Sequence, residues 1–376
     1  MTPSAADVLI IGGGIMGAST AFFLRQRGVS VIVLERNLVG QHASGTNFGN
    51  VRRQARFLRQ LPLANRAHRI WQRLPELIGD DIEFLQSGHI RVGYRPEQVE
   101  VLEKYALDAR DYGLDLELVS GAQMRQRYPF LGPKVAMASL SPDDGHANPR
   151  LAAPAFARAA TRLGAQFHEN TEVATIEKWG VDFHASCADG RIFRAPTLLV
   201  ASGAWGDKMS ERFGEPVPMT ARGPQMGVTE PMPYAIGPAV GVATKVLEEM
   251  LYFRQIKRGN IIFGGCGRGP AYPETRRAYV LPEHTLTQFR QLAQLAPAIA
   301  RLNIIRVWSG IEGYMADELP VMGPSAKVSG LHYAFGFSGH GFQVGPGVGD
   351  VMAELIHTGA TSTPIEPFLI SRFAST

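Results

Sequence analysis

Two short apolar runs separated by a segment of helical pattern occupy the first forty residues. Residues 8–11 (Val-Leu-Ile-Ile) and 30–34 (Ser-Val-Ile-Val-Leu) have the pattern of buried strands, and residues 18–27 are apolar at helical spacing. Gly28 follows at a position where glycine commonly ends a helix. The order strand, helix, strand predicts a parallel sheet with the connecting helix packed on it.

Beyond residue 40, segments of this α/β kind alternate with segments that are rich in strands. The α/β kind returns as a helix at 150–163, strands at 166–168, 172–178, 198–201 and 331–335, a glycine loop after 335, and a helix from 348 to 357. The strand-rich kind comprises strands at 89–93, 250–254 and 260–263 and helices at 99–112 and 282–295.

Because no repeat and no linker-like tract separates the two kinds of segment, we predict two interleaved domains in an α/β protein. The first is Rossmann-like with a parallel sheet, and comprises residues 1–82, 146–216 and 308–376. The second comprises residues 83–145 and 217–307, and is built on a mixed, largely antiparallel sheet with helices.

Composition narrows the classes of function. The 376 residues are 45% hydrophobic, which is enough to bury a substantial core, and a net charge of +4 does not indicate a nucleic-acid partner. With two cysteines, Cys187 and Cys266, the chain alone holds neither a disulfide framework nor a four-cysteine metal site. Residues 1–7 show no basic leader and the run at 8–11 is too short to span a membrane, so we expect a cytoplasmic protein without a metal.

A glycine motif lies at the first junction of strand and helix. Gly12, Gly14 and Gly17 fit the pattern G-x-G-x-x-G, with Ile15 and Met16 between the last two glycines. In this context the first glycine makes a tight turn, the second lets a pyrophosphate approach the backbone, and the third packs helix against strand.

The acidic residue expected after such a motif is Glu35, at the end of the second strand. A carboxylate there accepts hydrogen bonds from both ribose hydroxyls of an adenosine and disfavours a 2′-phosphate. The motif therefore predicts a dinucleotide, NAD or FAD rather than NADP.

Three further motifs resemble those of one family. Residues 336–342 (Gly-Phe-Ser-Gly-His-Gly-Phe), followed by Gly-Pro-Gly-Val-Gly at 345–349, resemble the C-terminal flavin loop of the D-amino-acid oxidase superfamily, and of its sarcosine oxidases in particular. Residues 308–323 resemble the motif that precedes this loop, and residues 201–205 resemble the central flavin motif. With the first glycine motif, four motifs in family order cover nearly the whole chain. The resemblance implies that the dinucleotide is FAD, bound by the first of the two domains, and that the second domain binds the substrate.

The physical chemistry of the glycine loop agrees with this implication. Successive glycines at a helix start present backbone N–H groups, which would stabilise negative charge near N1 and the C2 carbonyl of a reduced flavin. In the monomeric sarcosine oxidases a cysteine tethers the flavin, and the matching position here is Gly310, so we predict noncovalent FAD. The motifs and the resemblance together indicate these cofactor residues: Gly12, Gly14, Ile15, Met16, Gly17, Glu35, Arg36, Ser44, Asn47, Gly49, Val173, Ser202, Gly203, Trp205, Gly310, Gly336, Gly339, His340, Gly341, Phe342 and Gln343.

The resemblance also implies the reaction. A hydride passes from the carbon next to an amine nitrogen to flavin N5, and water hydrolyses the resulting imine. No dedicated protein base is essential if the pocket disfavours the ammonium form. The implied substrate is a small amino acid, in particular a secondary amine such as an imino acid, an N-substituted amino acid or an opine.

Arginines that follow a polar, glycine-containing loop at residues 41–50 are candidates for holding the substrate carboxylate. In the sarcosine oxidases an arginine at the position of Arg52 lies close to the flavin, and the carboxylate-binding position that follows corresponds to Ala55, with Arg56 adjacent. Tyr252 and Arg254 alternate on a predicted strand, so both point to one face, and Arg254 is the second candidate for the carboxylate.

Three residues near the C-terminal motifs complete the candidate catalytic set. Gln343 replaces a lysine that grips the carboxylate in the monomeric sarcosine oxidases, which argues against sarcosine itself. Glu312 stands where glycine oxidases carry an arginine; it indicates a substrate with a positive group, a salt bridge to a pocket arginine, or a structural pair. His340 lies inside the glycine loop, as a structural residue or as an acid or base.

A lysine that this chain lacks bears on the identity of the electron acceptor. The oxygen-activating lysine of the monomeric sarcosine oxidases has no counterpart on the strand at 260–265, which favours a dehydrogenase. An oxidase that produces hydrogen peroxide and a non-catalytic flavin-binding protein within a larger complex are the alternatives. Residues 308–349 are similar to the catalytic subunits of heteromeric sarcosine oxidase, opine oxidase and hydroxyproline dehydrogenase complexes, which implies partner chains with iron-sulfur or second-flavin centres and leaves open a peripheral contact with the inner face of the membrane.

Overall fold

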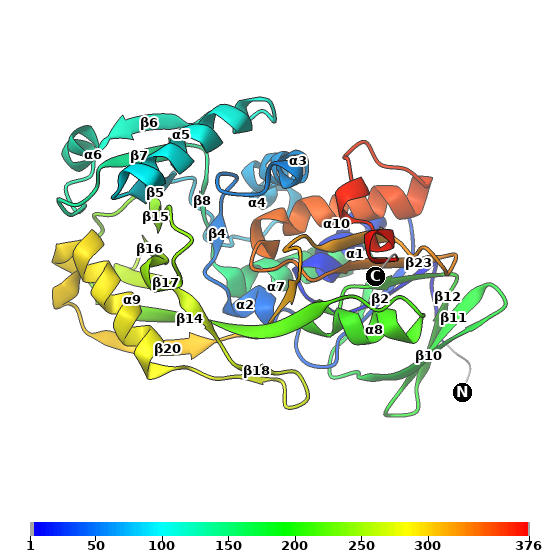
Figure 1. Ribbon diagram of the computed structural model, residues 1–376. Helices are drawn as coiled ribbons and strands as arrows, with labels where there is room; N and C mark the ends of the chain where they lie inside the picture. Colours follow the sequence, from blue (N-terminus) through cyan, green and yellow to red (C-terminus); the bar gives the residue numbers. More distant parts are fainter. Residues whose placement is uncertain (1–3, 375–376) are drawn as a thin grey trace.

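The computed structural model describes residues 4–374, in which two large sheets lie side by side (Figure 1). The first sheet, on the right of Figure 1, is covered by long helices, and the second lies on the left. This arrangement confirms the predicted fold class, a parallel α/β unit joined to a unit with a largely antiparallel sheet.

The first sheet carries the N-terminal glycine motif. Its spatial order is β22 (Val321–Pro324), β23 (Leu331–Phe335), β13 (Thr197–Val200), β2 (Val8–Ile11), β3 (Val31–Leu34) and β9 (Gln166–His168). All neighbouring strands are parallel except the edge pair β22 and β23. Strands β2 and β3 are buried along their whole length because both faces of the sheet are covered, which explains their continuous apolar runs.

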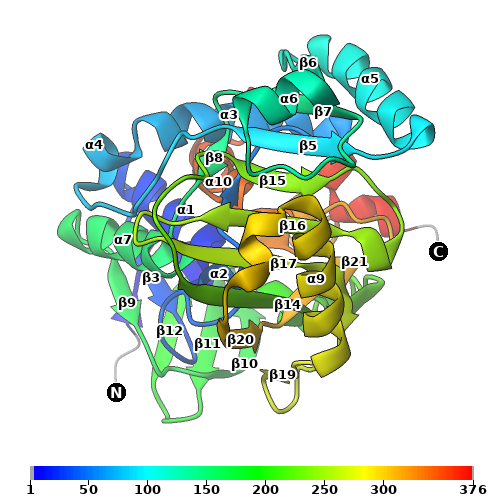
Figure 2. The same cartoon turned by 90° about the vertical axis from the view of Figure 1, so that its left-hand side faces the viewer.

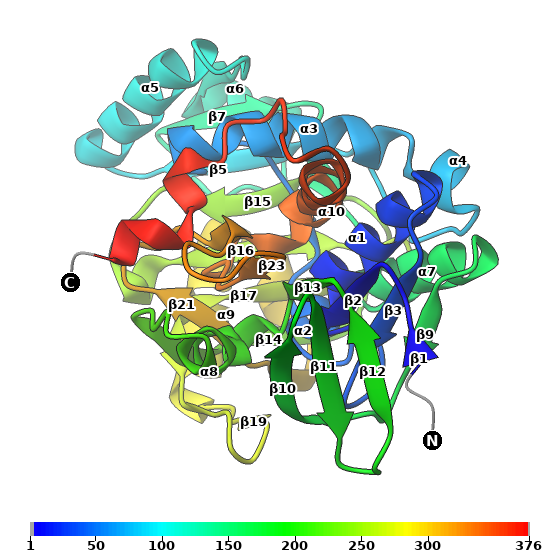
Figure 3. The same cartoon turned by 90° about the vertical axis from the view of Figure 1, so that its right-hand side faces the viewer.

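Four helices cover one face of this sheet and a small sheet covers the other. The helices are α1 (Ile15–Gln26), α3 (Leu61–Gln72), α7 (Pro149–Arg162) and α10 (Gly341–Thr358). The small sheet has the order β1 (Ser4–Ala5), β12 (Ile192–Ala195), β11 (Asp182–Cys187) and β10 (Val173–Trp179), and three of its strands are seen at the front of Figure 3.

The second sheet forms the other half of the molecule (Figure 2). Its order is β20 (Ile304–Ser309), β14 (Met219–Pro231), β17 (Asn260–Gly269), β16 (Leu251–Gln255), β15 (Ala239–Val242), β5 (His89–Gly93), β7 (Met137–Ser141) and β6 (Glu117–Ser120), and β21 (Glu312–Met315) also pairs with β14. Only the pair β15 and β5 is parallel. Helix α9 (Pro282–Leu295) packs on this sheet through Leu292 and Leu295, and α5 (Pro96–Arg110) and α6 (Gly121–Arg127) lie beside β5 to β7.

The two sheets draw on the chain segments that the sequence assigns to two domains, with one departure. Strand β20 runs across the predicted boundary at 307/308, and β21 lies beyond it, yet both pair with β14 of the second sheet. The domain limits themselves stay a prediction. None of the helices within residues 4–374 is long and apolar enough to cross a membrane.

The C-terminal glycine segment differs from the expectation of a loop that lasts to residue 348. Helix α10 begins at Gly341, so its later glycines are helical. A Cβ atom built on Gly347 would lie 2.8 Å from Cβ of Ala67 in α3, and one on Gly349 would lie 2.3 Å from Oγ of Ser19 in α1. These glycines let three helices approach closely, and the prediction that they belong to a flavin-binding loop was wrong for this reason.

Candidate active site

A cavity of about 660 Å³ is lined both by the ends of first-sheet strands and by β15, β16 and β17 of the second sheet. The predicted cofactor and catalytic residues all lie on its wall, except Gly17, Gly310 and Arg254. We call the part near the N-terminal glycine motif the dinucleotide end, and the part near β5, β16, β17 and β21 the substrate end.

The N-terminal glycine motif forms a tight cradle at the dinucleotide end. Gly12 has a φ of 109°, and a Cβ atom there would lie 2.5 Å from the carbonyl oxygen of Ala201. A Cβ atom on Gly17 would lie 2.0 Å from the carbonyl oxygen of Gly12. Gly17 therefore packs helix against strand, as the motif predicts for its third glycine, and this is why it does not line the cavity.

The Glu35 carboxylate is held at the carboxyl end of β3. It accepts hydrogen bonds from the backbone N–H of Gly13 at 2.7 Å and of Asn37 at 2.8 Å. Next to it, the Arg36 guanidinium lies 3.8 Å from the ring centroid of Trp205, and its Nη2 atom is buried without a hydrogen-bond partner. An unpartnered donor beside a fixed carboxylate fits the ribose and pyrophosphate of a dinucleotide, which offer both donors and acceptors.

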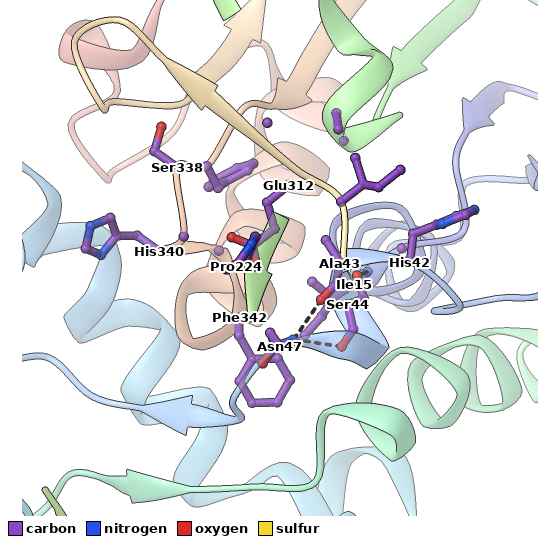
Figure 4. A pocket seen from close by; sticks show the side chains of 18 of the residues that line it. Ile15, His42, Ala43, Ser44, Asn47, Pro224, Glu312, Ser338, His340 and Phe342 are labelled. Atoms are coloured by element: carbon purple, nitrogen blue, oxygen red, sulfur yellow. Dashed lines mark hydrogen bonds between the residues drawn. The ribbon is translucent and has the colours of Figure 1, made fainter. Parts of the chain in front are cut away.

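The polar loop after β3 wraps around the start of α1. Oγ of Ser44 accepts a 2.9 Å hydrogen bond from the N–H of Ile15, the first residue of the helix. Asn47 donates through Nδ2 to the carbonyls of Ala43 and Ser44, both at 2.9 Å, and accepts from the N–H of Gly49 at 2.8 Å (Figure 4). The loop is thus fixed by its own side chains on the cavity wall.

The C-terminal motif enters the cavity where α10 begins. Gly336 and Gly339 have φ values of 70° and 80°, and Ser338, at 51°, accepts a 3.0 Å hydrogen bond from the N–H of Met315. Figure 4 shows Ser338 and His340 on the turn that leads into this helix. The first N–H groups of a helix have no partner within it, so the start of α10 suits an anionic or carbonyl acceptor at this position.

Two tyrosines surround Glu312 at the substrate end. The hydroxyl of Tyr314 donates a 2.9 Å hydrogen bond to the Glu312 carboxylate, and the ring of Tyr252 packs edge-on against Phe48, with 4.7 Å between centroids. Burial raises the pKa of Glu312 above its ordinary value, although the Tyr314 hydrogen bond and the charge of Arg268 oppose this. Within residues 4–374 no cationic group lies within 4 Å of Glu312, so the structure shows no salt bridge between Glu312 and a pocket arginine. What it shows is a pair of Glu312 with Tyr314, joined by a hydrogen bond.

Arginines approach the glycine loop from the segment after β4 (Asn50–Val51). Arg56 donates from Nε to the carbonyl of Arg52 at 3.0 Å and from Nη1 to the carbonyl of His340 at 2.9 Å. Burial and the charges of Arg52 and Arg56 hold the pKa of His340 well below its ordinary value, so the ring is neutral at physiological pH. The backbone carbonyl of His340 anchors Arg56, and its ring Nδ1 is buried without a hydrogen-bond partner.

Three predicted residues have different surroundings from those expected. Arg254 does not face the cavity; its guanidinium is buried and donates to the carbonyls of Phe48 at 2.8 Å and Ala147 at 3.3 Å. The Gln343 amide donates to the carbonyl of Ala64 at 2.9 Å in α3. Arg254 also donates from Nη1 to Nδ1 of His146 at 3.1 Å, so all three of its guanidinium nitrogens have protein partners. The Oε1 atom of Gln343 is buried without a hydrogen-bond partner.

Gly310 is the third predicted residue whose surroundings differ from those expected. A Cβ atom there would lie 1.9 Å from Oγ1 of Thr46, and Gly310 is not part of the cavity wall. The neighbouring Trp308 donates from its indole N–H to the Thr46 carbonyl at 2.8 Å, which keeps this strand end tight against the polar loop. Position 310 therefore offers no room for a larger side chain.

Sequence reasoning missed Arg91 on β5 and Arg268 on β17, both of which line the substrate end. Arg268 lies over the ring of Tyr314, with 4.0 Å between Cζ and the centroid, and 3.9 Å from Glu318. A charged residue flanked by two apolar residues in the strand 89–93 was the available signal for Arg91. Arg268 carried no comparable signal, because its position depends on the pairing of β17 with β14.

Comparison with known proteins agrees with this geometry. The model of the family described as FAD dependent oxidoreductase matches residues 7–355. The chain belongs to this family. The glycine oxidase of Geobacillus kaustophilus is 27% identical to it and the match covers 97% of each chain; one of the subunits of the opine oxidase of Rhizobium meliloti is 25% identical, with 98% of this chain and 97% of the relative covered.

Solved structures extend the similarity to three dimensions. The L-proline dehydrogenase of P. horikoshii superposes with a TM-score of 0.92 at 27% identity, and the match covers 99% of each chain. The glycine oxidase of Geobacillus kaustophilus superposes with a TM-score of 0.90 at 25% identity, covering 98% of this chain and 99% of the other.

As a member of the FAD-dependent oxidoreductases, the protein is an enzyme and uses FAD. The cradle at Gly12, the fixed carboxylate of Glu35, the unpartnered Arg36 Nη2 and the free N–H groups at the start of α10 fit that cofactor. The resemblance inferred from four motifs is confirmed.

Proposed function

We propose that the protein is an FAD-dependent dehydrogenase that oxidises the C–N bond of a small amino acid, in particular a secondary amine such as an imino acid, an N-substituted amino acid or an opine. The relatives named for L-proline and opines support the secondary amine, and the relative named for glycine supports a small amino acid. The imine that results is hydrolysed by water.

One observation carries the proposal: the flavin loop, a carboxylate and a guanidinium group meet at one end of the cavity. A Cβ atom on Gly339 would lie 3.7 Å from Oε2 of Glu312, and Arg56 joins the carbonyl of His340 to that of Arg52. A substrate that carries both a carboxylate and an amine finds a complementary group for each beside the flavin loop.

In this proposal Arg52 binds the substrate carboxylate, and Glu312 orients the amine with its own carboxylate held by Tyr314. FAD, when bound, supplies the acceptor for the hydride. The raised pKa of Glu312 makes it a better proton acceptor than an exposed glutamate, so it can take up the proton that an ammonium group must lose. Because His340 stays neutral, it does not compete for that proton.

A dehydrogenase is favoured over an oxidase by the nature of the cavity wall. Among the described residues that line it, the only lysine is Lys208, on α8 (Gly206–Arg212) next to the dinucleotide-end residues Trp205 and Met209. No lysine is therefore placed at the substrate end to assist the reaction of reduced flavin with oxygen. A hydrogen peroxide assay in air, compared with turnover in the presence of a dye acceptor, separates the two activities.

The test of the proposed reaction is an anaerobic screen of the yellow holoenzyme against D-, L- and N-substituted amino acids. Bleaching of the flavin by at least one secondary amino acid is expected, and Arg52→Lys should raise the concentration needed for half-maximal bleaching at least tenfold, since a lysine lacks the planar fork. Failure of every amino and imino acid to bleach the flavin would refute the proposal.

The protein is further proposed to bind FAD without a covalent bond, to lie in the cytoplasm and to work with partner subunits that carry an iron-sulfur or second-flavin centre. Relatives named as subunits of an opine oxidase and of a sarcosine oxidase support the partner subunits. Purification of the native protein under mild conditions, followed by iron and flavin analysis of the co-purifying chains, tests this. A native protein that elutes alone with full turnover contradicts it.

A further inference from the structure

Three arginines gather on one wall of the substrate end. Arg52 and Arg56 come from the segment after β4, Arg91 comes from β5, and all three line the cavity. Arg56 is tied to Arg52 by a hydrogen bond to its carbonyl, and the charge of Arg52 is among the causes that lower the pKa of both Arg56 and Arg91. The three guanidinium groups therefore form one electrostatic cluster, which we call the arginine cluster.

Among the described residues, no carboxylate forms an ion pair with the arginine cluster. Within residues 4–374, none lies within 4 Å of the guanidinium groups of Arg52, Arg56 or Arg91. The neighbouring Arg53 is the contrast, because it pairs with Asp144 at 3.3 Å and Asp143 at 3.5 Å. The nearest acidic groups thus form their ion pairs with the arginine that does not line the cavity, although the charge of Asp144 also raises the pKa of Arg52 and Arg56 against the larger, opposite effect of burial.

Two members of the cluster keep hydrogen-bond donors free for a ligand. Arg56 gives two of its N–H groups to backbone carbonyls, whereas Arg52 donates from Nη1 to the carbonyl of Gln54 and Arg91 makes a single long contact of 3.4 Å to the carbonyl of Val242. None of their remaining nitrogens is buried without a partner, so these nitrogens are accessible from the cavity. Each guanidinium can still present a planar pair of donors to a carboxylate.

The surroundings of the cluster do not reduce its charge. Burial lowers the pKa of Arg56 to about 9 and that of Arg91 to about 10, so both remain protonated at neutral pH. His89, whose Nδ1 accepts a 2.8 Å hydrogen bond from Nε2 of Gln54, is held neutral by burial and by the charges of Arg52 and Arg91, which lower its pKa. Three positive charges in a half-buried wall repel one another, and an anionic ligand relieves that repulsion.

The substrate end carries more positive than negative side chains. At the substrate end the described lining residues carry four arginines, Arg52, Arg56, Arg91 and Arg268, against two glutamates, Glu312 and Glu318. Glu318 lies near Arg268, and Glu312 is assigned to the amine. An ordinary amino acid would neutralise one guanidinium of the arginine cluster and leave the others facing its uncharged side chain.

We propose that the substrate is an amino or imino acid with two carboxylates, one bound by Arg52 near the flavin loop and the other by Arg91 on β5. The inference rests on the proposed function, because the amine is taken to lie between these arginines and Glu312. Arg56 is a positioning residue in this scheme, since its bonds to Arg52 and His340 hold the cluster against the flavin loop. Arg91 then determines which amino acids are accepted.

Binding of carboxylic acids that lack an amine tests the inference without turnover. The holoenzyme is titrated with pairs of equal carbon number, propionate and malonate, butyrate and succinate, and pentanoate and glutarate, and the perturbation of the visible flavin spectrum gives each Kd. At least one dicarboxylate should bind ten times more tightly than its partner. In Arg91→Met that preference should vanish while the Kd for the monocarboxylate changes less than threefold; Arg301→Met, an exposed arginine away from the cavity, is the matched control.

The outcomes separate this inference from the proposed function. Equal affinities within every pair, or an Arg91→Met variant that loses both acids alike, overturn the two-carboxylate substrate even if single-carboxylate amino acids bleach the flavin. A clear preference for dicarboxylates without bleaching by any amino acid supports the anion site and refutes the proposed reaction. The wild-type comparison decides the matter on its own if Arg91→Met does not accumulate as folded protein.

Discussion

The hydroxyl of Tyr314 donates a hydrogen bond of 2.9 Å to the carboxylate of Glu312, and both residues lie on β21 at the wall of the cavity. This bond favours the ionised form of Glu312 and opposes the effect of burial, which raises the pKa. The balance between them sets the pH at which Glu312 can accept a proton.

Removal of that hydroxyl in Tyr314→Phe should displace the acid limb of the pH profile. The pKa of Glu312 rises when the bond is lost, so kcat/KM falls on the acid side at a higher pH than in the wild type. A hydrogen bond to a charged group contributes about 1.5–3 kcal/mol, so kcat/KM below the displaced pKa should drop about tenfold or more. Tyr279→Phe, an exposed tyrosine, is the control, and an unshifted limb in Tyr314→Phe would show that Glu312 does not exchange a proton with the substrate.

Gly17→Ala should abolish stable binding of FAD. The added Cβ would lie 2.0 Å from the carbonyl oxygen of Gly12, so the turn that carries the dinucleotide must move. The ratio of flavin to protein absorbance after purification measures the loss. Gly237→Ala is matched to it, since Gly237 has ordinary φ and no heavy atom within 4 Å of a built Cβ; full flavin content in Gly17→Ala would contradict the assigned role.

Gly310→Cys should not tether the flavin. A side chain at position 310 meets Thr46 rather than the cavity, so the thiol cannot reach the cofactor and the packing is disturbed. Overpacking of this kind costs about 1–3 kcal/mol, which lowers the melting temperature. Acid precipitation should leave all FAD in the supernatant for both the variant and the wild type. Flavin that stays with the precipitated wild-type protein would contradict noncovalent binding.

The free energy of unfolding should fall as the pH decreases below about 6.5, the ordinary pKa of a histidine. Burial and the charge of Arg254 hold the pKa of His146 well below its ordinary value, so the unfolded chain binds a proton that the native chain does not. Each such histidine lowers the stability by up to about 1.4 kcal/mol per pH unit between the unfolded pKa and the lower native pKa. Urea unfolding of wild type and His146→Asn over a pH series that brackets the unfolded pKa measures this. A smaller slope is expected in the variant, and an identical slope contradicts a neutral His146.

The parts of the fold that depend on local pattern could be predicted from the sequence. Apolar spacing in the N-terminal segment predicts strands β2 and β3 and helix α1. This strand–helix–strand unit is enough to predict that the cavity wall contains Gly12, Gly14 and Glu35. Helix α10 was placed too late because glycines that normally end helices are required here by the neighbouring helices α1 and α3. That requirement arises from tertiary packing, which a local pattern does not contain.

The substrate end could be predicted less completely for the same physical reason. Alternation on β16 put Tyr252 and Arg254 on one face, and Tyr252 lines the cavity. Arg254 lies beyond its edge, because the loop at Phe48 covers that part of the strand. Arg91 and Arg268 reach the site through strand pairings that join residues far apart in the chain, and no motif marks them.

The order of strands in the first sheet has a consequence for how the protein is made. Strand β13 lies between β2 and β23, so a sheet that begins at residue 8 is completed only when residues 331–335 are in place. The cavity wall likewise joins Gly12 to Gly341. Pairings of such high sequence separation form slowly, and a nascent chain on the ribosome exposes the edges of its central strands until these last residues emerge. The wall of the FAD site is therefore completed late in synthesis, when residues from both parts of the chain are in place.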